Sequence, residues 1–158
     1  MNRGIRSLAV RVGVTALTLC AIGCGVSAGR EEAEALAEQY FTKIQSGDIE
    51  SVLSLYSAKF YAVTSRADWS ALLQEQRARC GTPKTHTLVS WNVVSSFGTN
   101  SGTRTTLVYD VEYSNCRMSE KITVFKPSGG KIQIHGHLLK PETGNRNDKA
   151  DSQTTLKT

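Results

Sequence analysis

The sequence predicts an α+β domain in which N-terminal helices pack on a four- to five-stranded antiparallel sheet. Two patterns indicate this class: apolar residues recur with helical spacing between residues 31 and 80, and apolar and polar residues alternate from about residue 86 to 139. A chain of 158 residues that is 39% hydrophobic and 21% charged suits one modest globular domain. The same values exclude collagen-like, coiled-coil and wholly disordered chains.

The first residues have the layout of a secretory signal peptide. Arg3, Arg6 and Arg11 precede an uncharged and mostly apolar run from Val12 to Gly23, and small residues follow that run. The run is shorter than the roughly 20 residues that a transmembrane helix needs, and no later apolar run is long enough. We therefore expect residues 1–23 to be a signal peptide and the mature protein not to span a membrane.

Two cleavage sites remain open at the end of this run. Ala21-Ile22-Gly23-Cys24 resembles the bacterial lipobox, in which the cysteine is lipidated and becomes the new N-terminus, although leucine commonly stands at the first position. Gly25, rather than Asp, follows the cysteine, which resembles lipoproteins sent to the outer membrane. Val26-Ser27-Ala28 instead favours ordinary signal cleavage behind it, which would leave a soluble periplasmic or secreted protein.

The net charge argues against a nucleic-acid partner. The formal value of +5 includes the three arginines of the leader, and residues 24–158 carry 16 basic and 14 acidic residues, a net charge of +2. No cluster of Lys and Arg interleaved with aromatic residues remains, so the chain lacks the footprint of a nucleic-acid interface.

The first helix is expected from Glu31 to Ser46. Leu36, Tyr40 and Ile44 recur every four positions there, which gives the helix one apolar face. Gly47 then ends the helix, because glycine adopts the left-handed conformation common at helix C-termini.

Two further helices and a short strand are expected before the sheet. Asp48 can cap a short second helix that reaches Tyr56, and the apolar, β-prone stretch Phe60 to Thr64 predicts a short strand. Ser65-Arg66-Ala67-Asp68 fits a capping box that opens the third helix, and Gly81 lies beyond its end.

Four long strands are expected at about 86–97, 104–114, 119–126 and 131–139, followed by a polar tail, 141–158. The apolar faces of neighbouring strands must lie on the same side, which fixes the register of the hairpins. A loop from Thr99 to Ser101 then pairs Trp91 with Tyr109 and directs Val89, Trp91 and Val93 to the helices. An even-length loop, Asn115 to Met118, follows, and Ile122 pairs with Ile134.

Two cysteines, Cys80 and Cys116, lie in the body of the domain. Exported chains meet an oxidising compartment, so we expect a disulfide between them, with two unpaired thiols as the alternative. The bridge would close a loop of about 37 residues and contribute roughly 4 kcal/mol in the chain-entropy model.

Several turn and packing motifs resemble the nuclear transport factor 2-like superfamily, and small bacterial secreted proteins within it most of all. The resemblance covers residues 32–140, between a tether at 24–31 and the tail. It implies helices on a curved sheet that together form a cone, and no particular activity, since superfamily members include isomerases, dehydratases and inert binding modules. The motifs are Ser46-Gly47-Asp48, Leu53-Ser54-Leu55-Tyr56, Gly98-Thr99-Asn100-Ser101-Gly102-Thr103, Phe125-Lys126-Pro127 and Lys131-Ile132-Gln133-Ile134-His135-Gly136-His137.

An enzyme of this superfamily would need an acid or base inside the cone, and the expected register supplies none. Asp110 falls on the face away from the helices, and Asp68 is explained by helix capping. The inward face offers Tyr109 and Tyr113 but no mid-strand His, Asp or Glu. We therefore expect no catalytic residue, with an isomerase or hydratase as the alternative.

No metal or cofactor site is expected either. His135 and His137 share one strand face in the expected register, but two ligands are too few for a metal, and solvent-facing histidines explain them. Gly129-Gly130 forms a hairpin turn and lacks the pattern of a phosphate-binding loop.

The chain is thus interpreted as a non-catalytic, lipid-anchored periplasmic or surface module that binds a protein partner or an apolar small ligand. The membrane, reached through lipid on Cys24, is the first expected partner. A homodimer through the outer sheet face, where Val108 and Phe125 lie outward, is another possibility. Four aromatic residues are candidates to line a small apolar cavity, or else simply to fill the core: Tyr40, Trp69, Trp91 and Tyr109.

Overall fold

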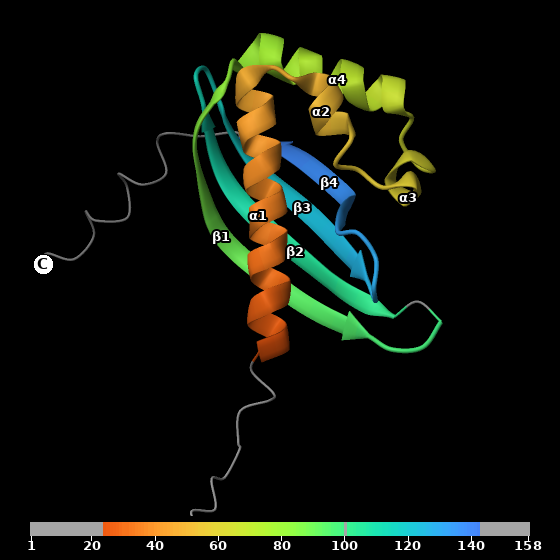
Figure 1. Cartoon of the computed structure of the whole chain (residues 1–158). Coiled ribbons are helices and arrows are strands. Elements are labelled where there is room, and N and C mark those ends of the chain that lie inside the picture. Colours follow the sequence, from red (N-terminus) through yellow and green to blue (C-terminus); the bar gives the residue numbers. More distant parts are fainter. Residues whose placement is uncertain (1–23, 100, 143–158) are drawn as a thin grey trace, which may run out of the picture.

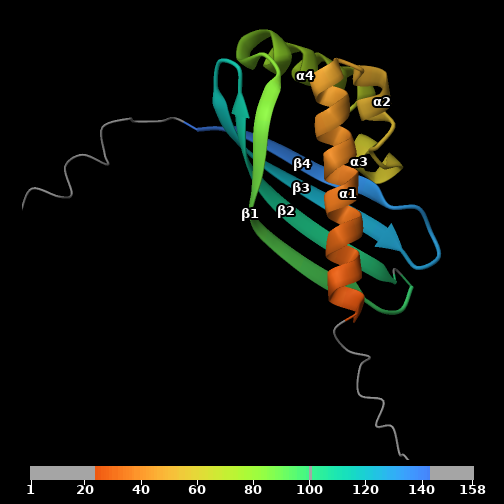
Figure 2. The same ribbon diagram turned by 60° about the vertical axis from the view of Figure 1, so that its left-hand side comes forward.

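The computed structural model describes residues 24–99 and 101–142, which form four helices followed by an open, four-stranded antiparallel sheet. The strands follow chain order across the sheet, as β1 (Pro83–Ser96), β2 (Gly102–Tyr113), β3 (Arg117–Pro127) and β4 (Gln133–Pro141). Figures 1 and 2 show α1 (Cys24–Ser46) running along one face of this sheet. The α+β class predicted from the sequence is confirmed.

Helix α1 begins at Cys24, earlier than the expected start at Glu31, so residues 24–31 are already helical. Hydrophobic periodicity missed this first part because it carries no large apolar residue after Val26. Contacts to the sheet hold it instead: Thr105 Oγ1 donates to the Gly29 carbonyl at 3.1 Å, and Lys126 Nζ pairs with the Glu32 carboxylate at 2.7 Å.

The first short helix has its predicted cap. The Asp48 side chain accepts from Ser51 N at the start of α2 (Ile49–Leu53), and hydrogen bonds from the Ser51 side chain and then from Ser51 N lower the pKa of the exposed Asp48 carboxyl. The short strand expected at 60–64 is wrong, because the Ser57 hydroxyl accepts from Phe60 N and opens α3 (Ala58–Tyr61).

The capping box of the third predicted helix is confirmed. The Ser65 hydroxyl accepts from Asp68 N at the start of α4 (Arg66–Cys80), and the helix ends at Gly81, whose φ is +78°. Figures 1 and 2 show α4 crossing one end of the sheet beside α2, far from the N-terminal end of α1.

The sheet register differs from the expected one through the length of the β1–β2 loop and through two β-bulges. The β1–β2 pairing ends at Ser96 and Gly102, so the loop is longer than the expected 99–101, and Trp91 pairs with Leu107 and not with Tyr109. The pairing then shifts between Leu88 and Ser90, so that Leu88 pairs with Tyr109. Val89 is consequently exposed and does not enter the core. A bulge adds one residue to a strand and reverses the side to which the following side chains point.

The second bulge lies in β4, where Thr123 pairs with Gly136 but Val124 pairs with Ile134. His135 is the extra residue, and Ile122 therefore pairs with His137, not with Ile134 as the simple alternation predicts. The prediction that the even-numbered residues of β3 face inward is confirmed. The β2–β3 turn is tighter than the loop expected at 115–118, because Tyr113 N donates to the Cys116 carbonyl.

The core lies between α1 and the inward face of the sheet and continues under α4. It joins apolar residues of every helix and of strands β2, β3 and β4, including Leu36, Phe41, Leu53, Phe60, Leu73, Leu107, Val111, Ile122 and Ile134. Within the described part of the chain, no helix is long and apolar enough to cross a bilayer.

Candidate functional site

The four aromatic candidates do not form one cavity. Tyr40, Trp69 and Tyr109 are buried in the core, with Tyr109 against Phe41 of α1. Trp91 does not join them, because it lies on the sheet's edge strand, remains 43% exposed and is covered by the Arg30 guanidinium, 4.7 Å from the ring centroid. The buried members pack against other side chains and act as core residues.

A carboxylate does occupy the interior, contrary to the sequence-based expectation. Glu120, near the start of β3, is completely buried and shares the inward face with Ile122 and Val124. His137 of β4 also points inward, with a side chain that is 0% exposed, and its Nε2 lies 3.1 Å from Glu120 Oε2. The prediction that both histidines of β4 face solvent is therefore wrong for His137.

The pair belongs to a buried network that draws on five parts of the fold, strands β3 and β4 among them. Gln76 Nε2 of α4 donates to Tyr113 Oη of β2 at 2.7 Å, and Tyr113 Oη donates to Glu120 Oε1. On the other side, Tyr56 Oη, in the segment after α2, lies 2.7 Å from His137 Nδ1. Both carboxyl oxygens of Glu120 thus have partners, as buried polar atoms require.

Burial, and then the neighbouring Glu120 carboxylate, raise the pKa of Tyr113 well above its ordinary value, so its phenol stays protonated and serves as a donor. Tyr40 also has a raised pKa, from burial and then from Glu120. Tyr40 Oη and Trp69 Nε1 are buried next to this network but make no hydrogen bond of good geometry. The arrangement keeps the Glu120 carboxyl group and the His137 ring out of contact with solvent.

Asp110 lies on the outer sheet face, between the inward Tyr109 and Val111, and is only half-buried. One of its oxygens, Oδ1, is buried without a hydrogen-bond partner. Asp68 is engaged at the start of α4, where it accepts from the Ser65 hydroxyl at 2.6 Å. Neither carboxyl group faces the interior.

The bulge at His135 separates the two histidines that the sequence placed on one face. His135 lies against the outward Phe125, with ring centroids 4.9 Å apart, while His137 lies inside. In the described part of the chain, no group of three or more His, Cys, Asp or Glu side chains is arranged to hold a metal ion.

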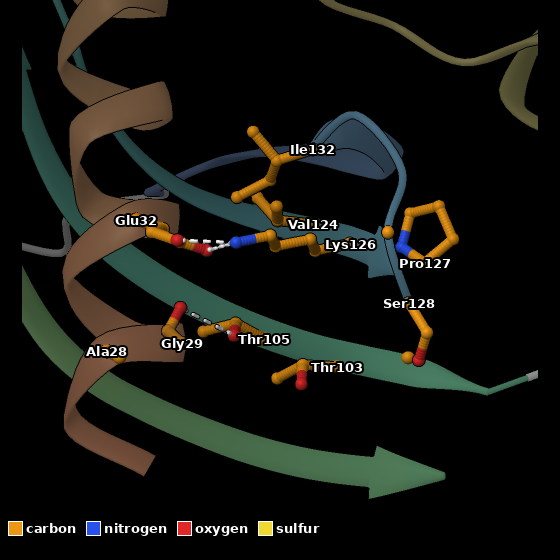
Figure 3. A pocket seen from close by; sticks show the side chains of 12 residues that line it. Ala28, Gly29, Glu32, Thr103, Thr105, Val124, Lys126, Pro127, Ser128 and Ile132 are labelled. Atoms are coloured by element: carbon orange, nitrogen blue, oxygen red, sulfur yellow. Dashed lines mark hydrogen bonds and ion pairs between the residues drawn. The ribbon is translucent and has the colours of Figure 1, made fainter. Parts of the chain in front are cut away.

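Figure 3 shows a pocket of about 210 Å³ between the first turns of α1 and the ends of β2 and β3. Glu32 and Lys126 pair with each other across it, and Thr105 donates to the Gly29 carbonyl. A Cβ on Gly29 would lie 2.9 Å from the Thr103 side chain, so glycine lets the helix approach the sheet there. Because its two charges neutralise each other, this pocket offers little attraction for an ionic ligand.

Cys80 and Cys116 form a disulfide, with Cα atoms 5.1 Å apart. The bridge joins the C-terminal end of α4 to the β2–β3 turn, where Asn115 N also donates to the Cys80 carbonyl. The lipidation candidate Cys24 is the first residue of α1, and Cys20 lies outside the described residues.

No family model, curated protein or solved structure matches this chain significantly. A function must therefore be inferred from the geometry described above.

Proposed function

We propose that the chain is an exported, lipid-anchored and non-catalytic binding module of the nuclear transport factor 2-like type. One observation carries the non-catalytic part: Glu120 and His137, the acid–base pair of the interior, are fully buried and hydrogen-bonded to the protein's own side chains. A general acid or base must come within hydrogen-bond reach of its substrate, and this pair lines neither the pocket of Figure 3 nor three further surface pockets of the described residues.

The order and placement of the elements support the proposed fold family. A long first helix lies across one face of an antiparallel meander, and the short helices close one end of it, which is compatible with a cone (Figures 1 and 2). In the proposed family the cone's interior holds the ligand site of the enzymes, and here that volume is filled by Tyr40, Tyr56, Trp69 and the Glu120–His137 pair.

Carbethoxylation of the histidines tests whether the interior is closed. We expect diethylpyrocarbonate to modify the half-buried His135 while His137 stays protected in the folded protein and reacts only after denaturation. Peptide mass spectrometry after a time course measures both rates in the same sample, so His135 is the internal control.

Equal rates for the two histidines in the folded protein would contradict the proposal. They would show that solvent-sized molecules reach Glu120 and His137, and the isomerase or hydratase alternative would then be preferred.

The anchor rests on the lipobox-like stretch that ends at Cys24. We expect cells expressing the full chain to incorporate labelled palmitate into it, and the C24S variant to lose the label and the membrane association. The C20S variant is the matched control and should keep both. A C24S protein that is still labelled would rule out this anchor, and an unlabelled wild-type protein would favour cleavage behind Ala28.

A further inference from the structure

A cleft of about 570 Å³ lies on the outer side of the sheet, near the β1–β2 hairpin. Arg104 of β2 and Phe125 of β3 are direct partners in the register and point outward there, since their neighbours Thr105 and Val124 are buried. His135 lies on the same side because it follows the inward Ile134 in β4, and Lys59 of α3 completes the wall.

The fixed charges in this cleft are of one sign. Lys59 and Arg104 line it together with His135, and no carboxylate does. Lys59 and Arg104 make no ion pair with any residue of the described part of the chain, whereas Lys126 in the pocket of Figure 3 is neutralised by Glu32. The pKa of His135 is lowered first by burial and then by the positive charges of Lys59 and Arg104.

The cleft also presents aromatic surface. Phe97, near the hairpin tip, is 93% exposed, although large apolar side chains are usually covered. The Phe125 ring lies 4.9 Å from the His135 ring and 6.0 Å from the Arg104 guanidinium, so cationic and aromatic groups alternate along the wall.

We propose that this cleft binds a small organic anion that carries an aromatic ring. The acidic group of the ligand, a phosphate, sulfate or carboxylate, lies between Lys59 and Arg104, and its ring lies against Phe97 and Phe125. Arginine suits this role because its planar guanidinium can donate two parallel hydrogen bonds to such an anion. The inference rests on the proposed binding function and gives that function a site and a ligand class.

The test uses 8-anilinonaphthalene-1-sulfonate, an aromatic sulfonate whose fluorescence rises on binding. We expect saturable binding, weakened about tenfold or more in each of R104Q and K59Q, because a charge-assisted hydrogen bond is lost. F97A should weaken binding several-fold through lost ring contact. The matched control is K126Q in the other pocket, which should bind as the wild type does.

Two further measurements separate recognition of the anion from general hydrophobic binding. N-phenyl-1-naphthylamine has the same rings without the sulfonate, and its binding should be weaker and insensitive to R104Q. In NMR titrations of the wild type, the bound sulfonate should raise the pKa of His135, since a nearby negative charge favours the imidazolium. Circular dichroism of each variant establishes that it is folded.

Unchanged binding in both R104Q and K59Q, loss of binding in K126Q, or equal affinity for the uncharged analogue would each overturn the site. Failure of the proposed function gives a different result. Carbethoxylation of His137 in the folded protein, or palmitate labelling of C24S, would contradict that function independently of the dye-binding measurements.

Discussion

Replacement of Glu120 by alanine is expected to lower the free energy of unfolding by about 3–5 kcal/mol, the usual cost of removing one partner of a buried ion pair. The substitution leaves Tyr113 Oη and His137 Nε2 buried without their acceptor. E120Q should cost less, about 1 kcal/mol, because its amide oxygen still accepts from Tyr113 Oη and its NH₂ group donates to His137 Nε2 once the imidazole proton has moved to Nδ1. Urea unfolding followed by tryptophan fluorescence measures both values.

K121A is the matched control, since Lys121 is the next residue of β3 and is exposed on the other face. It should change the unfolding free energy by no more than about 0.5 kcal/mol. If E120A cost less than 1 kcal/mol, or if E120Q were as damaging as E120A, the buried network would not be what ties α4 and the Tyr56 segment to the sheet.

The second large effect is expected from the disulfide. Its cysteines are 36 residues apart in sequence, so the C80A/C116A variant should lose about 4 kcal/mol of stability through the greater entropy of its unfolded chain. Urea midpoints, measured in the C24S background so that Cys24 cannot exchange with the bridge, give the difference.

Dithiothreitol provides the control for this measurement. It should destabilise the C24S protein to the level of the C24S/C80A/C116A variant and leave that variant itself unchanged. A wild-type midpoint that does not move on full reduction would contradict the stabilising role, because the loop would then be constrained equally well by the surrounding hydrogen bonds of Ser114 and Asn115.

Local signals in the sequence predicted the starts of α2 and α4, whereas α3 was mistaken for a strand although its Ser57 cap is equally local. Ser65 with Asp68, and Asp48 with Ser51, are short-range caps, and each depends only on residues within one helical turn. The first turns of α1 escaped prediction because their stabilising contacts, from Thr105 and Lys126, come from strands far along the chain.

The interior acid–base pair was missed for two different reasons. Glu120 could have been found, since it has the same parity as Ile122 and Val124 on the predicted inward face, but its place near the strand's start removed it from a search of mid-strand positions. The inward orientation of the His137 side chain could not have been predicted, because it depends on the bulge at His135. Only the neighbouring Gly136 indicates an irregularity in the strand.

The start of α1 at the proposed acylated residue would also limit how far this protein reaches. A helix of 23 residues is about 34 Å long, and no flexible linker would separate its first residue from the lipid. The disulfide-bonded end, close to the far tip of α1, would then stand within a few tens of ångströms of the lipid surface. A macromolecule that docks at that end would then have to come close to the membrane. Partners whose size or charge keeps them away from the lipid surface would be excluded.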